Sequence, residues 1–420
     1  MADRSDARRV VVLDDDPTGT QAATDVTVLL DADPAALADV LAHESAVYVQ
    51  TNSRSLSEQD AVALARRIRA TLGSLRRTAG IETTVVLRGD STLRGHVFAE
   101  SRVFVEDDAV LLFVPAFPEG GRTTLGGRHF VDSGEGRVPV GETEFAADPV
   151  FGFRSSTLPG FVRERAGSDA TLATLDDVRG GRLAGILSDA RAGAIVVADA
   201  EATDDIRAVA EAVRRAWRER PVVVRSAAPL AAELADVASM GRFDPATLRT
   251  EGAVLVVCGS HTDLARTQLS HLVRCVGAPT EIDTARALAD PVAEGRRAAA
   301  AEANRRRPDG IRVVTTERDR SPEHATLAHG AAVMTALTTA AELLADDAAL
   351  VVTKGGITAS DVIHGSLGAQ RARVRGQVQP GVSVWDVPGR NGDVRCVIVP
   401  GNMGSATVLV DVVGWARGRS

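Results

Sequence analysis

The sequence predicts an α/β protein with two domains, each built on a mostly parallel β-sheet flanked by helices. The first observation is that apolar, strand-like runs alternate with helical patterns along almost the whole chain. Strands that are apolar throughout are typical of parallel sheets covered on both faces. The second observation is the length of 420 residues, which exceeds a typical single domain of about 150 residues. The third is a loss of core periodicity near 238–252.

Each expected element rests on its own local pattern. Short runs rich in valine, isoleucine and leucine predict strands at 9–13, 26–30, 46–50, 83–87, 109–114, 193–198 and 221–225, and then at 253–258, 279–283, 311–315, 348–353 and 394–399. Apolar residues at helical spacing predict helices at 57–77, 203–218, 261–275, 323–345 and 404–416. The order of strand and helix favours parallel pairing in both halves.

The break in periodicity divides the chain into domains at 1–240 and 250–420. The segment 115–160 is rich in glycine, proline and threonine, and we expect it to be a long excursion over one face of the first domain. Long loops in compact domains are often functional.

Composition excludes several classes of protein. Apolar residues make up 45% and charged residues 25%, as in an ordinary globular protein, and the net charge of −8 argues against nucleic acid or an anionic membrane as partner. No run of about 20 apolar residues is present, so no membrane span is expected.

The charged N-terminus leads directly into a strand, which does not fit a signal peptide. Cys258, Cys275 and Cys396 are too scattered for a disulfide framework or a zinc cluster. We therefore expect a cytoplasmic enzyme with small-molecule partners.

Ligands of open α/β sheets bind at the carboxyl ends of strands, so the residues after each strand are the first candidates. Strand 9–13 is followed by three adjacent acids, Asp14, Asp15 and Asp16. Adjacent carboxylates repel one another, and a turn does not need three of them. A cation, or a hydroxyl group that needs a base, would justify them. The alternative is a polar turn in which an aspartate caps the next helix.

Arginines follow two neighbouring strands. Arg54 comes after strand 46–50, and its planar guanidinium group can form two hydrogen bonds to a carboxylate. An arginine that faces solvent is equally compatible with this segment. Strand 83–87 leads into a turn that contains Arg88, Asp90, Ser91 and Arg94. Two arginines and the backbone N–H groups of a helix start would together make an anion site. The alternative here is a capping box without a ligand.

The second half offers small residues at three strand ends. They are Ser260 after strand 253–258, Lys354-Gly355-Gly356-Ile357-Thr358 after strand 348–353, and Gly401-Asn402 with Gly404 after strand 394–399. Turns of this kind let the backbone approach a ligand and direct helix N-termini at it. Lys354 is the only lysine among the 48 Lys and Arg residues, which singles it out, although a single case can also arise by chance.

Three glycine-containing turns in one domain indicate a site for a polyphosphate. Neither a Gly-x-x-x-x-Gly-Lys-Ser/Thr loop nor a Gly-x-Gly-x-x-Gly turn is present, so a bound nucleotide would use a less common arrangement. The first half offers acids and arginines suited to a small hydroxy acid. A cleft between the two domains would bring the two sets together.

These motifs resemble the four-carbon acid sugar kinases, a family of ATP-dependent kinases of threonate, erythronate and oxo-tetronate acids. The resemblance covers nearly the whole chain, and Asp-Ser-Thr-Leu-Arg-Gly is its most specific motif. The matching segments are Asp15 to Gly19, Thr51 to Arg54, Asp90 to Gly95, Val140 to Pro149, Val197 to Ala200, Gly259-Ser260 and Gly355 to Ala359.

The resemblance implies an N-terminal acid-sugar-binding domain, a C-terminal nucleotide-binding domain, and transfer of the γ-phosphoryl group of ATP to a hydroxyl of the acid sugar. Asp15 or Asp16 would orient or deprotonate that hydroxyl. The substrate would be held by Arg54, Arg88, Asp90, Ser91 and Arg94. The nucleotide, with Mg²⁺ bridging its phosphates, would be held by Ser260, Lys354, Gly355, Gly356, Ile357, Thr358, Gly401, Asn402 and Gly404.

The sequence departs from the family pattern at three places. Arg88 stands where the family usually has lysine, and Ile357 stands where it has an acid after the glycine pair. The segment 399–404 shares only its glycines with the family's C-terminal motif. These departures leave the details of phosphate and metal contact open.

Two alternative hypotheses compete with the kinase. Residues 10–18 also fit the first motif of haloacid-dehalogenase-like phosphatases, with Asp14 as nucleophile and Lys354 as the distant lysine. The phosphatase hypothesis leaves the Arg88 to Arg94 turn unexplained. A non-catalytic sensor would bind the acid sugar without ATP. The sequence does not rank the three acids, choose the sugar or its hydroxyl, identify the Mg²⁺ ligands, or decide whether the chain forms a homo-oligomer.

Overall fold

The computed structural model describes residues 9–16, 19–106, 108–132, 134, 136–239, 241–305, 307, 309–317, 327–390 and 392–419. The chain divides into two compact units, Met1–Ser239 and Met240–Ser420. Each unit contains its own sheet and its own buried cores, and each is described separately below.

The sheet of the first unit has the strand order β2-β3-β1-β4-β11-β5-β10-β9, and each neighbouring pair in this order is parallel. Its strands are β1 (Arg9–Asp14), β2 (Val26–Leu29), β3 (Ala46–Gln50), β4 (Thr83–Arg88), β5 (Val110–Val114), β9 (Ala170–Ala173), β10 (Ile195–Ala198) and β11 (Val222–Ser226). The central strands are almost fully buried, as their apolar sequences predict.

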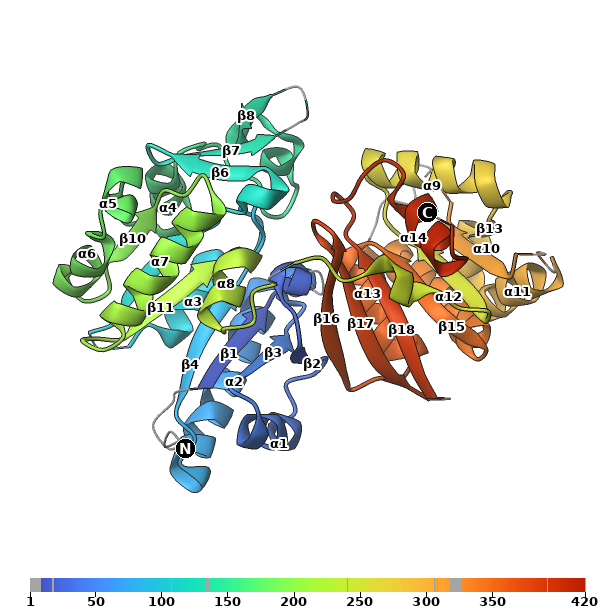
Figure 1. Ribbon diagram of the computed structural model, residues 1–420, viewed down its shortest axis with the longest axis horizontal. Helices are drawn as coiled ribbons and strands as arrows, with labels where there is room; N and C mark the ends of the chain where they lie inside the picture. Colours follow the sequence, from blue (N-terminus) through green and yellow to red (C-terminus); the bar gives the residue numbers. More distant parts are fainter. Residues whose placement is uncertain are drawn as a thin grey trace. The chain divides into compact units, whose positions relative to one another are not determined.

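Helices cover this sheet, as Figure 1 shows. They are α1 (Pro34–His43), α2 (Glu58–Ala79), α3 (Val97–Phe104), α4 (Leu158–Ala166), α5 (Leu175–Arg179), α6 (Leu183–Asp189), α7 (Thr203–Ala216) and α8 (Ala228–Leu234). The longest, α2, begins at a Ser57 cap and ends at Gly80, which has φ +65°, a conformation that glycine adopts without strain. Its apolar face packs Ile68, Leu72 and Leu75 on β1 and β3.

The segment 115–160, predicted as a loop excursion, contains regular structure. Strands β6 (Arg122–Leu125), β7 (Arg128–Asp132) and β8 (Arg137–Pro139) form a three-stranded antiparallel sheet. The turn at Gly126 and Gly127 donates both backbone N–H groups to the carboxylate of Asp199, each at 2.8 Å. These strands are short and rich in polar residues, so their sequences carry little apolar alternation.

The sheet of the second unit has the order β13-β14-β12-β15-β18-β17-β16. Pairing is parallel from β13 to β18 and antiparallel from β18 through β17 to β16. The strands are β12 (Ala253–Cys258), β13 (Thr280–Ile282), β14 (Ile311–Thr316), β15 (Ala348–Lys354), β16 (Arg371–Gln379), β17 (Val382–Gly389) and β18 (Gly392–Val399). Figure 1 shows the last three side by side. This antiparallel addition is absent from the sequence prediction.

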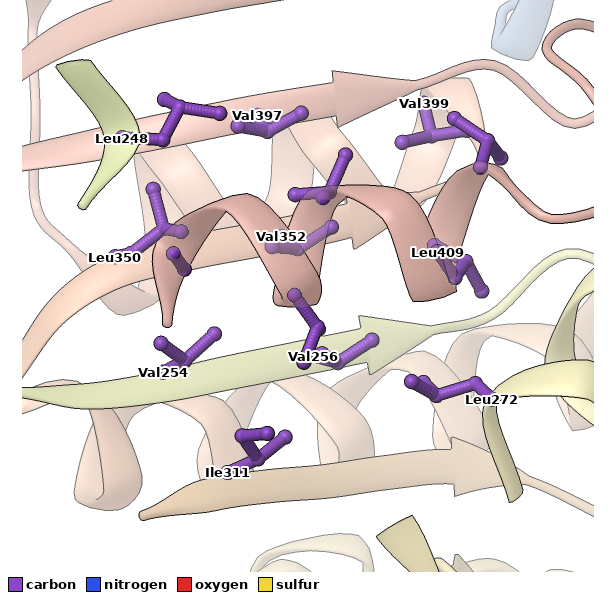
Figure 2. Close-up of a cluster of buried hydrophobic side chains, with 14 of the residues drawn as sticks. Leu248, Val254, Val256, Leu272, Ile311, Leu350, Val352, Val397, Val399 and Leu409 are labelled. Carbon is purple, nitrogen blue, oxygen red and sulfur yellow. The ribbon is translucent and has the colours of Figure 1, made fainter. Parts of the chain in front are cut away.

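The helices of this unit are α9 (Asp263–Val276), α10 (Thr284–Ala289), α11 (Pro291–Asn304), α12 (Leu327–Ala345), α13 (Gly356–Asp361) and α14 (Val408–Ala416). Figure 2 shows α14 running along the sheet, in front of β15 and between β12 and β18. Leu409 of α14 belongs to one buried cluster with Val256, Val352 and Val397. The predicted helix 404–416 begins four positions later, after the glycine turn, and residues 323–326 of another predicted helix lie outside the described part of the chain.

The predicted α/β class and the mostly parallel sheets flanked by helices are confirmed. The register of the strands explains why the candidate residues gather in each unit. In the first unit Asp14 pairs with Gln50 on one side and with Arg88 on the other, and Arg88 pairs with Ser226. Since the carboxyl ends of these strands are level, the turns that follow them share one edge of the sheet.

Candidate active site

Asp14 is the last residue of β1, and its side chain is fully buried. Its carboxylate accepts hydrogen bonds from Arg88 Nη1 at 3.0 Å and from Gln50 Nε2 at 3.2 Å. Gly19 makes room for it, because a Cβ at that position would stand 2.0 Å from each carboxylate oxygen. Burial raises the pKa of Asp14 to about 7, against the lowering effect of Arg88.

Asp15 is also buried, with 1% of its side chain exposed, and three arginines surround it. The distances from its carboxylate oxygens are 2.9 Å to Arg225 Nη2, 3.4 Å to Arg54 Nε and 3.6 Å to Arg88 Nη1. The carboxylate of Asp15 therefore serves to position these arginines. Of the two acids predicted as catalytic, only Asp16 keeps appreciable exposed surface, at 17%.

Asp16 pairs with Arg54, whose Nη2 lies 2.5 Å from its Oδ2. Arg54 is presented by a short 3-10 turn that follows Asn52, a residue with φ +46°. Asparagine tolerates this left-handed conformation better than most residues. Burial opposes the charge of Arg54, but Asp16, Asp15 and Asp90 outweigh it and raise the pKa of the guanidinium.

The turn after β4 holds Asp90 and Arg94 together, with Arg94 Nε 2.8 Å from Asp90 Oδ2. Thr92 donates its hydroxyl to the same oxygen. Arg94 also lies over the ring of Phe145, 4.9 Å from the centroid, and 25% of its side chain is exposed. Although burial favours the neutral acid, Arg94 and Arg54 outweigh it and lower the pKa of Asp90, so Asp90 is ionised at neutral pH.

Arg88 and Ser91, both predicted to bind substrate, are buried, with 3% and 9% exposed. Arg88 contacts Asp14 and Asp15 beneath the turn. The backbone carbonyl of Ser91 is held by His129 Nε2 at 2.8 Å. Because a carbonyl can only accept, Nε2 carries the proton, and Nδ1 therefore accepts from the Thr124 hydroxyl at 2.8 Å.

Sequence reasoning missed Arg225, Glu100 and His129. Arg225 is 2% exposed and joins Glu100 Oε2, at 3.0 Å, to Asp15. A lone arginine that follows three valines in β11, one residue before the strand ends, was the available signal for this network. His129 lies in the segment predicted as loop, and burial lowers its pKa to about 4, so it is neutral at physiological pH.

In the second unit, β12, β15 and β18 end level with one another, because Cys258 pairs with Lys354 and Lys354 with Val399. The three glycine turns therefore share one edge of this sheet. Gly355 N donates to Val399 O at 2.9 Å, and Thr262 Oγ1 donates to Gly401 O at 2.5 Å. Ser260, Gly355 and Gly401, predicted to bind nucleotide, are thus brought together.

The glycines keep this edge open. Gly355 has φ +114°, and a Cβ there would stand 3.2 Å from both Ser260 Cβ and Thr358 Oγ1. A Cβ on Gly401 would stand 2.8 Å from Ser260 Oγ. The hydroxyl groups of Thr358 and Ser260 therefore lie beside Gly355 and Gly401, and Gly356 begins α13 next to Gly355.

The remaining predicted nucleotide residues have different settings. Lys354 is fully buried, and its ammonium donates to the carbonyl of Pro400, so it supports the third turn from beneath. Burial lowers the pKa of Lys354 to about 8. Ile357 is 52% exposed. Asn402 and Gly404 lie in the third turn, where Gln268 Nε2 donates to the carbonyls of Met403 and Ser405 at 3.2 and 2.8 Å.

Comparison with known families gives this geometry a context. Residues 10–234 match the family model described as the sugar-binding N-terminal domain, and residues 255–409 match the nucleotide-binding C-terminal domain. The chain belongs to the four-carbon acid sugar kinase family. The resemblance expected from the motifs is thereby confirmed.

Two curated relatives of the family are named D-threonate kinases. The protein from Salmonella typhimurium is 30% identical over 301 residues, which covers 67% of this chain and 65% of that protein. The protein from Bordetella bronchiseptica is 35% identical over 263 residues, which covers 61% of this chain and 58% of that protein. The chain thus matches these relatives over less than two thirds of their length.

Two solved structures share the fold. A Salmonella typhimurium protein described as a putative tRNA synthase has a TM-score of 0.71 at 20% identity, over 96% of this chain and 98% of that one. A Haemophilus influenzae protein has a TM-score of 0.64 at 18% identity, over 97% and 99%. In the described part of the chain, no helix has the length and apolar character needed to cross a membrane. The described residues also contain no group of three or more His, Cys, Asp and Glu side chains placed to hold a metal ion.

Proposed function

We propose that this protein is an ATP-dependent kinase that phosphorylates a hydroxyl group of a four-carbon acid sugar. The observation that carries the proposal is the cluster of Asp16, Arg54, Asp90 and Arg94, defined by the ion pairs at the carboxyl edge of the first sheet. D-threonate is the first candidate substrate, because the curated relatives carry that name.

Arg54 and Arg94 are the groups we assign to the substrate carboxylate. Their side chains are 17% and 25% exposed, so they combine a fixed position with an accessible face. Guanidinium groups bind carboxylates through two parallel hydrogen bonds, which orients as well as attracts the acid. Asp90 fixes Arg94 at 2.8 Å and lies 3.9 Å from Arg54, so it sets the spacing of the two cations.

Asp16 is the group we assign to the attacking hydroxyl. Phosphoryl transfer depends mainly on positioning and charge neutralisation, with an acid to orient the nucleophile and accept its proton. Asp16 is the most exposed of the three adjacent acids, whereas Asp14 and Asp15 are buried beneath it. Arg54, at 2.5 Å, holds its carboxylate in one orientation.

The second unit would bind the nucleotide at its glycine edge. Backbone N–H groups near Gly355 and Gly401, with the hydroxyls of Ser260 and Thr358, suit a polyphosphate. Mg²⁺ would arrive with the phosphates and neutralise charge that builds up on them, and Ser260 and Thr358 offer it oxygen donors. Lys354 would act indirectly, by fixing the turn that begins at Pro400.

The phosphatase alternative has little support. Its nucleophile would be Asp14, whose carboxylate is buried and already bonded to Arg88 and Gln50. An attacking carboxylate needs access to a phosphate ester. Thr18, the threonine of that motif, lies outside the described residues.

A coupled assay of ADP release tests the proposal directly. The acids to screen are the threonates and erythronates of both configurations, together with their 2- and 3-oxo forms, at saturating ATP and Mg²⁺. We expect ADP release that depends on one or a few of these acids, and much less in Asp16→Asn. Binding of one of these acids without ATP binding and without ADP release would contradict the kinase and favour a sensor.

A further inference from the structure

A pocket lies in the first unit at the amino-terminal ends of β4 and β11, whereas Asp16 follows the carboxyl-terminal end of β1. It has a volume of about 670 Å³ and is bordered by α2, the amino-terminal parts of β4 and β11, the end of α3, and Trp217. Small-molecule sites usually have volumes of roughly 300–1,000 Å³. The proposed kinase mechanism makes no use of this pocket.

The pocket lies where α3 ends. This helix has eight residues, and its last residue, Phe104, borders the pocket. Thr83, Thr84 and Val85 at the amino end of β4 are half-buried, whereas Val86 and Leu87 are fully buried. A central strand flanked by β1 and β11 would ordinarily be covered along its whole length.

The lining is rich in arginine. It includes Arg66, Arg69, Arg76 and Arg77 from α2, against two acids, Glu82 and Glu106. Both acids form ion pairs within the protein: Glu106 pairs with Arg69, and Glu82 Oε1 lies 2.9 Å from Arg76 Nε.

Arg66 and Arg77 form no ion pair with any residue in the described part of the chain. Both are exposed on the pocket side of α2. The pocket therefore carries an excess of positive charge that the protein itself does not neutralise, and an anionic ligand would do so.

Gly73 shapes the floor of the pocket. Glycine within a helix costs about 1 kcal/mol relative to alanine, and Gly73 sits in the middle of the 22-residue α2. A Cβ there would stand 3.4 Å from Arg77 Nη1, so the guanidinium of Arg77 folds back along the helix over the glycine. The missing side chain thus leaves room for the guanidinium of Arg77, which borders the pocket.

We propose that this pocket binds an organic phosphate. Arg77, with Arg66, would take the phosphate group through charge-assisted hydrogen bonds. Phe104, Trp217 and Val223 border the same pocket and offer an apolar surface to the body of the ligand. This ligand site is separate from the carboxyl-edge site and adds to the proposed function without depending on it.

Phenyl phosphate is a suitable probe, because it combines a phosphate with a small aromatic body. Its affinity for the full-length protein can be measured by isothermal titration calorimetry. Arg77→Ala removes the cation, and Gly73→Leu fills the pocket with a good helix former. Arg67→Ala is the matched control, since Arg67 is an exposed arginine of the same helix that does not border the pocket.

We expect saturable binding in the millimolar range or tighter, weakened about 10-fold or more in Arg77→Ala and Gly73→Leu and unchanged in Arg67→Ala. Asp16→Asn should bind the probe as the wild type does, which separates this site from the proposed kinase site. Lack of saturation up to roughly 10 mM would overturn the proposal. So would equal binding by all variants.

Discussion

Arg225 Nη2 lies 2.9 Å from Asp15 Oδ2, although the two residues are 210 positions apart in the sequence. The other terminal nitrogen of Arg225 lies 3.0 Å from Glu100 Oε2. One buried guanidinium therefore joins β11, the turn after β1, and α3. Gly89 permits this close approach, because a Cβ there would stand 2.6 Å from the Arg225 guanidinium.

Replacing Arg225 with methionine should destabilise the protein strongly. The change leaves Asp15 and Glu100 buried with one partner fewer, and breaking a buried pair in this way costs about 3–5 kcal/mol. Urea unfolding measures the loss. Arg215→Met is the control, because Arg215 and its partner Glu211 are both more than half exposed, and such pairs contribute less than about 1 kcal/mol. Equal losses in the two variants would refute the role of Arg225.

Asp16→Asn should lower kcat by about 10²-fold or more, because it keeps the shape of the side chain and removes its basicity. Steady-state ADP release at saturating acid sugar measures the effect, and circular dichroism checks the fold. Asp31→Asn, a change at an exposed loop acid of the same unit, should leave kcat unchanged. A near-normal kcat in Asp16→Asn would move the base elsewhere.

Lys354→Met should raise the apparent KM for ATP or lower kcat. The variant loses the hydrogen bond from the ammonium to Pro400, and with it the constraint on the turn that carries Gly401 and Gly404. Initial rates over a range of ATP concentrations separate the two effects. Arg274→Met changes an exposed cation of α9 and serves as control. Unchanged kinetics in Lys354→Met would remove this residue from the nucleotide site.

Asp14 should make the free energy of unfolding fall as pH rises, which is opposite to the usual effect of an aspartate. Its pKa is raised from 3.8 to about 7, so between these values the folded state holds a proton that the unfolded state releases. Through this group alone, the free energy of unfolding falls as pH rises from about 4 to about 7 and is level above that.

The variant Asp14→Asn lacks this titration. Its free energy of unfolding, measured in urea at several pH values, should gain on that of the wild type as pH rises to about 7 and keep a constant difference above it. A constant difference across the whole range would mean that Asp14 is ionised throughout.

The fold could be predicted wherever burial leaves a clear sequence pattern. Strand β1 is apolar from Val10 to Leu13 and was predicted almost to its last residue, because a parallel strand buried on both faces has no polar positions. Strand β16, Arg-Ala-Arg-Val-Arg-Gly-Gln-Val-Gln, alternates polar and apolar residues and was missed. Because this strand has only one buried face, its three arginines and two glutamines interrupt the apolar run by which the other strands were predicted.

The sequence predicted which strand ends carry the candidate site, but it did not predict which of the site's side chains are buried and which are exposed. Sequence placed Asp14, Asp15 and Asp16 at one turn and could not rank them. Their ranking follows from burial, which depends on Gly19, Arg88 and Arg225 approaching from other parts of the chain. Arg88 was predicted to face the substrate for the same reason, since a motif names its residues without showing which side chains point inward.

The rarity of lysine has a practical consequence. Apart from the α-amino group, Lys354 carries the only amine of the chain, and it is enclosed at the end of β15. An acylating reagent specific for amines therefore has one internal target, which it can reach only when the second unit opens locally. Mass spectrometry of the acylated protein would follow such openings at a single atom, Lys354 Nζ, without any engineered label.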